Sequence, residues 1–389
     1  MKDRAKVMVA GGGIGGLTAA IALRRAGFEV SVFERAAELR EVGAGLLLAA
    51  NAQKALKTLS LAEAVARLGT PASAGEIHSW RGKVLASIPA AELEKKIGAP
   101  NAAVHRADLQ ALLAREVGDG TLRLGAEVGA FEQDQSGVRV HFADGSEDSA
   151  DILVGADGLR SRVRAGLFGP EEPRYAGYTA WRAVVEPDEE LLPWGAGFES
   201  WGRGARFGCA HVGRGRVYWF ATANAPEDEK DGPPGSLAGA KARLLRLFAG
   251  WHRPVGNLVE ATEEGAILRT DIYDREPLGE HWGTGRVTLL GDAAHPMTPN
   301  LGQGACQAIE DAVVLARCLD EGGAIAEALR RYERLRADRT AMVVRRSRRV
   351  GVVGQLENAL LCRLRDRVLT IIPQKVQLGQ LEEVLGYEI

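Results

Sequence analysis

A glycine-rich segment near the start of the chain, VMVAGGGIGGLTAA at residues 7–20, constrains the fold more than any other feature. The apolar run before the glycines is typical of a buried strand, and the residues after them favour a helix. Gly11, Gly13 and Gly16 complete the spacing G-x-G-x-x-G, which permits a tight turn, close approach of backbone to a phosphate, and close packing of helix on strand. The segment predicts the first strand, loop and helix of a parallel α/β domain.

The next predicted strand, residues 29–33, ends in an acidic residue. Glu34 follows the glycine loop by roughly 20 residues, the distance at which a carboxylate accepts hydrogen bonds from a ribose. Unpaired N–H groups at the helix start would face a pyrophosphate. Together these features predict a dinucleotide site, and the acidic side chain disfavours the 2′-phosphate of NADP.

Composition narrows the class of protein. With 389 residues, the chain is long enough for two domains that share a cleft. Its formal net charge of -2 gives no whole-chain reason to expect nucleic acid or an anionic membrane as a partner. The four cysteines lack C-x-x-C spacing and the seven histidines lack ligand spacing, so we expect reduced thiols, a cytoplasmic location and no metal site. No stretch of sequence is apolar for long enough to predict a transmembrane helix.

A second glycine-rich segment, LLGDAAHPMTPNLGQGACQAIEDA at residues 289–312, indicates which dinucleotide is held. A strand is predicted at residues 286–290, and a helix is predicted to begin near residues 302–303. Asp292 at the strand end can accept hydrogen bonds from a sugar-alcohol chain, while the helix start favours a negatively charged ring. Reduced FAD needs both contacts. NAD has neither a ribityl chain nor a ring that becomes anionic, so the segment favours FAD.

The middle of the chain differs in kind from both ends. Residues 175–220 hold ten of the 22 aromatic residues, on short predicted strands with many glycines. We expect an antiparallel sheet there. Its aromatic face has two interpretations that stay open, a packed sheet surface or a cover over an apolar ligand cleft.

The order of the predicted elements makes the cofactor domain discontinuous. Three short strands at residues 127–133, 138–142 and 151–154 are expected to form a small meander laid on the parallel sheet. After residue 267 the chain is expected to return to the first domain. The predicted fold is α/β, with a Rossmann-like FAD-binding domain (residues 1–74, 101–174 and 268–335), an inserted antiparallel-sheet substrate domain (75–100 and 175–267) and a C-terminal helical segment (336–389).

The last fifty residues are predicted to be helical and basic. We interpret their arginines as a solvated helix face, with a docking surface for an acidic partner or a membrane as the less favoured alternative. A leucine-rich stripe from Leu356 to Val368 is expected to pack within the molecule, with insertion into lipid as the less favoured alternative. No third globular domain is expected after about residue 340. The arginines concerned are Arg336, Arg339, Arg345, Arg346, Arg348 and Arg349.

Three segments together resemble the signatures of the single-component FAD-dependent aromatic hydroxylases: GGGIGG with Glu34, GADGLRSRVR at residues 155–164, and the second glycine-rich segment. The resemblance covers nearly the whole chain. The segment from DIYDREP onward is especially similar to zeaxanthin epoxidases, while YAGYTAWRAVVE is similar to urate and salicylate-type hydroxylases. The resemblance implies an NAD(P)H- and FAD-dependent monooxygenase, an oxidoreductase that hydroxylates an aromatic or heteroaromatic small molecule with molecular oxygen through a flavin hydroperoxide. NAD(P)H would visit only as a transient co-substrate.

The resemblance also implies which residues hold the cofactor. Asp157 would serve both FAD and the site of the reductant, and Asp292 would take the ribityl hydroxyls. Arg106 would contact the phosphates or the ribityl chain. The full set is Gly11, Gly13, Gly15, Gly16, Glu34, Arg35, Arg106, Asp157, Asp292, Leu301, Gly302, Gln303, Gly304 and Ala305.

The candidates for contact with the substrate are fewer. Arg206 and Tyr218 match positions near the substrate in the urate hydroxylase relatives, and Pro299 would face the substrate across the flavin. His211 could accept a phenolic proton, because an imidazole titrates near neutral pH. For Arg206, His211 and Tyr218, the alternative is an ordinary structural place in the sheet.

Other activities remain open at this point. Epoxidation of a polyene or olefin is a variant of the same chemistry. A flavin-fold protein that binds a lipid without catalysis belongs to a different class, and a flavin dehydrogenase would incorporate no oxygen. We expect a small aromatic or olefinic substrate, no nucleic-acid partner and no transmembrane segment.

Overall fold

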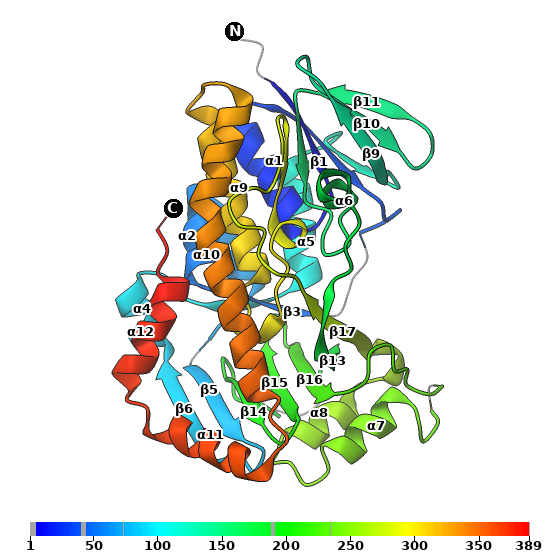
Figure 1. Cartoon of the computed structure of the whole chain (residues 1–389). Helices are drawn as coiled ribbons and strands as arrows, with labels where there is room; N and C mark the ends of the chain where they lie inside the picture. Colours follow the sequence, from blue (N-terminus) through cyan, green and yellow to red (C-terminus); the bar gives the residue numbers. More distant parts are fainter. Residues whose placement is uncertain (1–4, 40–43, 73, 188–190, 234, 389) are drawn as a thin grey trace.

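The computed structural model describes residues 5–39, 44–72, 74–187, 191–233 and 235–388. Figure 1 shows a parallel sheet near the N-terminus, a larger sheet at the opposite end of the molecule, and a long helix that runs past both. The elements that join the two sheets therefore decide where a site can form.

The parallel sheet is the nucleotide-binding half that the glycine-rich segments predict. Its strands lie in the order β18-β12-β1-β2-β8, and every pairing is parallel. The apolar residues of its central strands are almost completely buried, because parallel strands are covered on both faces. The strands are β1 (Lys6–Ala10), β2 (Glu29–Glu34), β8 (Leu122–Leu124), β12 (Ile152–Gly155) and β18 (Val287–Leu289).

Three helices pack together beside this sheet. Helix α1 (Ile14–Arg25) contacts both α5 (Arg106–Val117) and α9 (Gly304–Asp320). Small buried side chains such as Ala19 and Ala20 let α9 approach α1 closely. The starts of α1 and α9 therefore lie at the same edge of the sheet, where the strands end in glycine-rich loops.

The small meander differs from the prediction in its third strand. A separate sheet holds β9 (Val128–Gln133), β10 (Val138–Phe142) and β11 (Glu147–Ala150), whereas residues 152–155 pair with β1 in the parallel sheet. Strand β11 reads EDSA, which carries no apolar alternation that would reveal a strand.

The seven-stranded sheet corresponds to the aromatic middle of the chain. Its order is β17-β13-β16-β15-β14-β5-β6, antiparallel except for the β14–β5 pair. The apolar residues on one face, Trp181, Phe207 and Trp219 among them, pack against α7 (Ala240–Leu247) and α8 (Val255–Ala261). The strands are β5 (Ala74–Ser79), β6 (Val84–Pro89), β13 (Arg174–Val185), β14 (Gly197–Trp201), β15 (Ala205–His211), β16 (Val217–Asn224) and β17 (Leu268–Asp274).

This sheet also corrects a predicted domain boundary. The chain was expected to leave the sheet after residue 267, yet β17 pairs with β13 along its length. Strand β17 reads LRTDIYD and is half polar, so its place at a sheet edge is decided by pairing and not by an apolar run. The return to the first domain follows Asp274.

A third sheet joins the two larger ones. Strands β3 (Gly45–Leu48) and β4 (Thr70–Pro71) both pair with β7 (Ala102–His105). Strand β3 contacts α9, and β7 contacts β15 of the large sheet. Helices α2 (Ala50–Thr58), α3 (Ala62–Leu68) and α4 (Ala90–Ile97) surround this junction.

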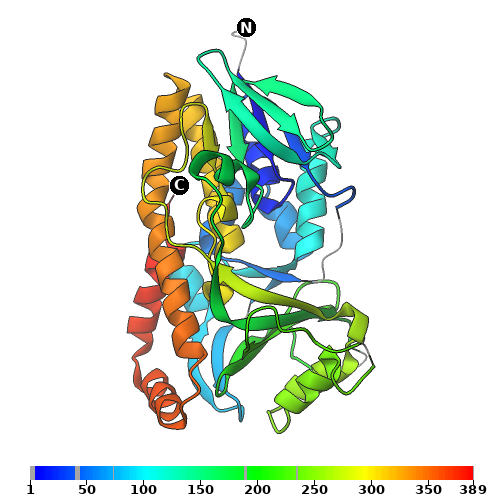
Figure 2. The same ribbon diagram turned by 45° about the vertical axis from the view of Figure 1, so that its right-hand side comes forward.

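The C-terminal part is helical, as predicted, but begins earlier. Helix α10 (Ile325–Gly354) is followed by α11 (Ala359–Ile371) and α12 (Gln374–Leu385). Figure 2 shows α10 alongside both sheets, with α11 and α12 at the end of the molecule that holds β5 and β6. Within the described ranges, no helix is both long enough and apolar enough to cross a bilayer.

Candidate active site

The first glycine loop forms a tight cradle after β1. Gly11 has φ +107°, and a Cβ there would lie 2.3 Å from the carbonyl oxygen of Ala156. A Cβ on Gly16 would lie 1.9 Å from the carbonyl oxygen of Gly11. Gly13 differs, because a Cβ there would have no atom of a described residue within 4 Å. The loop is closed on its protein side and open beside Gly13, as close approach of a phosphate requires.

Glu34 lies directly under this loop. Its carboxylate accepts hydrogen bonds from the backbone N–H groups of Gly12 (2.7 Å) and Ala36 (2.9 Å). The side chain of Gln110 holds the other side of the loop, donating to the carbonyl oxygen of Gly12 at 2.8 Å. Glu34 therefore shapes the loop, a task that comes in addition to its predicted contact with a ribose. The sequence analysis missed Gln110, although it lies one helical turn after Arg106 on α5 and so shares its face.

The starts of α1 and α9 carry free positive ends. Gly13 precedes α1 and Gln303 precedes α9, and no described side chain caps either helix. Neither first turn contains an acidic residue. The first N–H groups of both helices thus lack helical partners, and the helix dipoles add partial positive charge. Two adjacent anion-binding helix ends suit a cofactor that carries a pyrophosphate and a ring that becomes anionic.

Asp292 stands between these features. It follows β18 in a short turn, Gly291–Ala293, and its side chain is accessible. Its Oδ1 lies 3.8 Å from the Cβ position of Gly304, at the start of α9. Although the side chain has accessible surface, the protein around it displaces much of the surrounding water; this desolvation raises the pKa of the carboxyl, and the charges of His295 and Arg106 partly oppose that rise. The structure therefore brings the predicted Asp292 and Arg106 within electrostatic range of each other.

The carboxylate of Asp157 is largely occupied by hydrogen bonds within its own loop. Its oxygens accept hydrogen bonds from the hydroxyl of Ser161 (2.5 Å) and from the backbone of Arg162 (2.7 Å) and Val163 (3.2 Å) at the start of α6 (Arg162–Phe168). Burial raises the pKa of Asp157. The geometry gives this residue a loop-building task, and its predicted contacts with FAD and the reductant stay a prediction.

Arg164, which was not among the predicted cofactor residues, joins two of the sequence signatures, and the remaining candidates lie at the surface and at the start of α9. The buried guanidinium of Arg164 donates to the carbonyl oxygens of Ala293 (3.2 Å) and Ala294 (3.1 Å), which ties the second signature to the turn carrying Asp292. Arg35 and Arg106 are exposed. Residues 301–305 form the turn and first residues that open α9, with Gly302 in the left-handed region at φ +62°.

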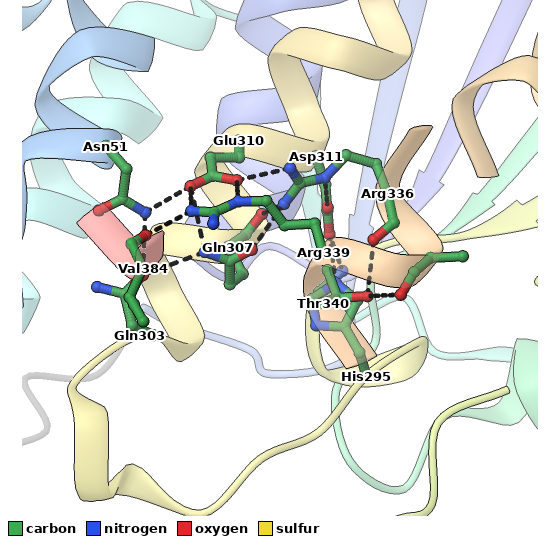
Figure 3. A network of polar contacts seen from close by, with 12 residues as sticks. Asn51, His295, Gln303, Gln307, Glu310, Asp311, Arg336, Arg339, Thr340 and Val384 are labelled. Carbon is green, nitrogen blue, oxygen red and sulfur yellow. Dashed lines mark hydrogen bonds and ion pairs between the residues drawn. The ribbon is translucent and has the colours of Figure 1, made fainter. Parts of the chain in front are cut away.

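A buried polar network supports the turn that carries Asp292. Asp311 on α9 accepts hydrogen bonds from the backbone of Gly291 (3.0 Å) and the ring of His295 (2.6 Å). Arg336 on α10 reaches Asp311 at 2.7 Å and Glu310 at 2.6 Å, as Figure 3 shows. The network therefore fixes the Gly291–Ala293 turn against two helices. His295 is thus held in the loop by its contact with Asp311.

This network contradicts one expectation. Arg336 and Arg339 were interpreted as part of a solvated helix face, yet Arg336 is fully buried and Arg339 nearly so. Arg339 donates to Glu310 and to the carbonyl oxygen of Val384 (2.6 Å). Two arginines and two carboxylates neutralise one another inside the protein, which burial of charge requires. A signal was present, because Glu310 and Asp311 interrupt an otherwise apolar helix.

The substrate candidates lie on the large sheet. Tyr218 and Phe220 alternate with buried Trp219 on β16, so their rings project from the face that α7 and α8 leave uncovered. A Cβ on Gly45 of β3 would lie 2.5 Å from the ring of Tyr218, and a Cβ on Gly208 would lie 2.4 Å from the ring of Phe220. Glycine at both positions makes room for a broad aromatic surface.

Strand β3 connects this aromatic face to the cofactor half. Gly45 packs on Tyr218, while two residues later Leu47 lies 3.4 Å from the Cβ position of Gly302. The thiol of Cys306 on α9 also donates to the carbonyl oxygen of Leu47 at 3.3 Å. The aromatic face and the start of α9 are thus the two sides of one site.

Arg206 is buried and fully engaged. Its guanidinium donates to Gln355 (2.9 Å), Glu199 (2.9 Å) and Asn300 (2.6 Å). Asn300 follows Pro299 directly, and the side chain of Pro299 is accessible. The structure therefore brings Arg206 and Pro299 together through Asn300, with Arg206 as a support of the loop and not as a free cation.

His211 is not brought into this group. It belongs to the same side of β15 as Phe207 and Cys209, opposite Arg206 and Gly208. Its ring lies 3.0 Å from the carbonyl oxygen of Leu192 and packs beside Trp194. The geometry thus offers His211 an ordinary place in the sheet, and nothing in it favours the predicted proton transfer.

Sequence analysis missed one cation on the aromatic face. Arg182 of β13 pairs with Phe220, on the Tyr218 side of the sheet, and its charge lowers the pKa of Tyr218. Burial has the larger effect, so the pKa of Tyr218 is raised overall. The Arg182 side chain forms no ion pair with any residue that the structure describes. The sequence carried a signal for this position: in YTAWRAVV, Arg182 directly follows Trp181, and neighbouring residues of a strand lie on opposite faces.

The residues present fit FAD. The open side of Gly13 and the uncapped start of α1 suit a pyrophosphate. The uncapped start of α9 suits an anionic ring edge, and the accessible carboxylate of Asp292 between the two helix starts suits a ribityl chain. The aromatic sheet face lies across β3 from the ring-binding helix start, where a substrate would stack.

Comparisons with known proteins agree with this geometry. The chain matches the family model described as "FAD binding domain" over residues 4–347. It is 48% identical over 372 residues to an aurachin C monooxygenase/isomerase of Stigmatella aurantiaca, covering 96% of this chain and 95% of that protein. It is 39% identical to a chloroplastic zeaxanthin epoxidase of Nicotiana plumbaginifolia over 92% of this chain, and it spans only 57% of that relative.

A solved structure extends the similarity to the fold. HpxO of Klebsiella pneumoniae, solved with FAD and uric acid, has a TM-score of 0.91 and 33% sequence identity, with 98% of this chain and 96% of that chain covered. FAD is therefore the cofactor, and the predicted Rossmann-like fold with an inserted sheet is confirmed. The chain belongs to the FAD-binding-domain family and is an FAD-dependent monooxygenase.

Proposed function

We propose that this enzyme hydroxylates an apolar aromatic or heteroaromatic molecule that stacks on the face formed by Tyr218 and Phe220, with NAD(P)H as the reductant. The observation that carries the proposal is the pair of aromatic rings, Tyr218 and Phe220, on the face of the large sheet that α7 and α8 leave uncovered. The two rings lie 6.2 Å apart and are tilted by 35°, and aromatic side chains bind other π-systems through offset stacking, edge contacts and area burial. The names of two relatives, an aurachin C monooxygenase/isomerase and HpxO solved with uric acid, support an aromatic or heteroaromatic substrate.

The polar groups of the face are suited to orient such a molecule. The raised pKa of Tyr218 keeps its hydroxyl protonated at neutral pH, so it acts as a hydrogen-bond donor. Arg182 supplies a positive charge nearby. An oxygen substituent with partial or full negative charge would be held by both, which also makes the ring carbon beside it electron-rich.

FAD, when bound, supplies the reduction and oxygen activation by which one oxygen atom reaches an electron-rich carbon. The chain contributes position and exclusion of water. Arg206 and Asn300 hold the loop of Pro299 against the aromatic face, and the packed β3 strand closes the space between Tyr218 and α9. Holding the reacting carbon close to the flavin ring can remove a large share of the activation free energy of the reaction.

A cytoplasmic location goes with this proposal. All four cysteines are free and buried, as expected in a reducing compartment, and NAD(P)H is available there.

The test is a product assay with the FAD-loaded protein. NADH and NADPH oxidation would be followed with aurachin C, uric acid, phenolic acids and zeaxanthin under ¹⁸O₂, and products would be identified by mass and by NMR. We expect an aromatic compound to accelerate oxidation and to gain one labelled oxygen on a ring carbon. If zeaxanthin alone gave a labelled product, and that product were an epoxide, the activity would be epoxidation and not hydroxylation. If a compound accelerated NAD(P)H oxidation but no product carried labelled oxygen, the proposal would be contradicted.

A further inference from the structure

An apolar strip runs along the outside of α11. Its members are large and exposed, with Leu360 at 71%, Leu364 at 58% and Ile371 at 67% of full exposure. At about 100° per residue they fall within a single arc of roughly 100° on the helix. We call this set the α11 strip: Leu360, Leu361, Leu364, Val368 and Ile371.

The strip corrects the expectation that these leucines pack within the molecule. The opposite side of the helix is what packs: Cys362 and Arg365 are buried. The guanidinium of Arg365 donates to the carbonyl oxygens of Gly202 (3.1 Å) and Gly354 (3.3 Å) and lies over the ring of Trp201. Helix α11 is therefore fastened to the large sheet with its apolar arc turned outward.

Positive charge borders the strip. Arg363 and Arg367 lie one turn apart on the edge of the apolar arc, are exposed, and form no ion pair with any residue in the described ranges. Between Arg345 and Lys375 the chain has eight basic and two acidic residues, although three of the basic side chains, Arg346, Arg348 and Arg365, form ion pairs with Glu383, Asp274 and Asp366. The basic excess is thus concentrated where the exposed apolar side chains are.

We propose that the α11 strip lies in the interface of an anionic phospholipid bilayer, with Arg363 and Arg367 at the level of the phosphates. An exposed apolar arc with flanking arginines is the pattern of a helix that lies in the membrane plane. The helix has 13 residues, too few to span a bilayer. A second copy is a poorer occupant, because pairing two strips would bring two sets of unpaired arginines together.

The strip lies at the β6 edge of the large sheet, whose β16 strand carries Tyr218 and Phe220. Helix α11 contacts β6, and Figures 1 and 2 both show it at the end of the molecule formed by β5 and β6. The link from α10 to α11 passes through Gln355, which accepts a hydrogen bond from Arg206. An apolar substrate dissolved in the bilayer would be held close to the sheet that binds it. The docking itself does not depend on which substrate the enzyme uses.

The test is sedimentation of the full-length, FAD-loaded protein with vesicles. We expect binding to vesicles of phosphatidylcholine and phosphatidylglycerol in equal parts, weaker binding to phosphatidylcholine alone, and loss of binding at high salt. The double variant Leu360→Ser with Leu364→Ser should lower the partition coefficient by about tenfold or more, since two apolar side chains are lost from the interface. Arg363→Glu with Arg367→Glu should abolish the preference for the anionic lipid.

Leu237→Ser is the matched control, because Leu237 is equally exposed but lies far along the chain in the segment before α7. Retained FAD and an unchanged melting temperature would show that each variant is folded. The proposal is overturned if the wild type ignores both kinds of vesicle, or if the leucine variant binds like the wild type. Light scattering that shows a dimer dissolved by the leucine variant, without vesicle binding, would assign the strip to self-association instead.

Discussion

The guanidinium of Arg206 donates a 2.6 Å hydrogen bond to Oδ1 of Asn300, and this contact joins the two halves of the active site. The same oxygen accepts the hydroxyl proton of Tyr178 at 3.1 Å, while Nδ2 of Asn300 donates to the backbone of Ser347 on α10. One amide therefore ties the large sheet, the Pro299 loop and the long helix together. Movement of any one of them would displace the Pro299 loop, which is predicted to face the flavin.

A double-mutant cycle of Arg206→Met and Asn300→Ala tests this coupling. We expect each single change to lower kcat/KM by about 10- to 100-fold, the effect of a small misplacement in the site, with FAD affinity unchanged. The double variant should lose little more than either single one. Arg203→Met, on the exposed neighbour, is the control. Additive losses would show that the two residues act separately.

Substitution of Tyr218 should lower kcat/KM, whereas substitution of His211 should leave it nearly unchanged. Tyr218→Phe removes a hydroxyl from the substrate face, so we expect kcat/KM to fall by about tenfold, the usual worth of one hydrogen bond. His211→Ala changes the other side of the sheet and should leave kcat/KM within about twofold of wild type. Because the pKa of Tyr218 is raised, the kcat/KM profile should show no phenolate step below pH 10. A greater effect at His211 would restore its predicted role as a base.

The variant Asp292→Ala should bind FAD more weakly than the wild type. The change removes a charged hydrogen-bond acceptor for the ribityl hydroxyls, so the affinity for FAD should fall by about 10- to 100-fold. The recovery of flavin fluorescence on dilution measures this affinity. The control is Asp338→Ala, an exposed carboxylate on α10. Equal FAD affinity in both variants would contradict the proposed place of the ribityl chain.

Arg336→Met should destabilise the fold strongly. The change leaves the charges of Glu310 and Asp311 buried without the arginine that both contact, which typically costs about 3–5 kcal/mol. Arg334→Met, two residues away and exposed, should change the free energy of unfolding by less than about 0.5 kcal/mol. Denaturant titration of the FAD-loaded proteins measures both, and similar losses would mean that the network contributes little.

Stability should also depend on acid through Asp311. Burial acts to raise its pKa, but the charges and hydrogen bonds of His295 and Arg336 outweigh burial and hold the pKa at about 2. A carboxyl in the unfolded chain has a pKa near ~3.9, so this contribution is complete above about pH 5 and is lost progressively as the pH falls through about 4 and on through the folded pKa. Unfolding measured between pH 6 and pH 3 should show this slope in the wild type and a shallower one in Asp311→Asn.

Much of the cofactor half could be predicted from the sequence because its requirements are local. The glycines at 11, 13 and 16 follow from the backbone of one turn, and Asp292 follows from one strand end. The helix expected near residues 302–303 begins at Gly304, only slightly later. Such features depend on neighbours a few residues away, so their pattern is legible in the chain.

Other features depended on partners far apart in the sequence. Burial of Arg336 required Glu310 and Asp311 on another helix, and β17 joined the large sheet because β13 offered its edge. The face on which Arg182, Tyr218 and His211 lie was fixed by strand register, which one residue of shift would reverse. The sequence alone thus determined the cofactor and its loops, through local backbone constraints. Tertiary structure decided which arginines are buried, which support the site and which side of α11 faces outward, because long-range packing assigns each side chain its partner.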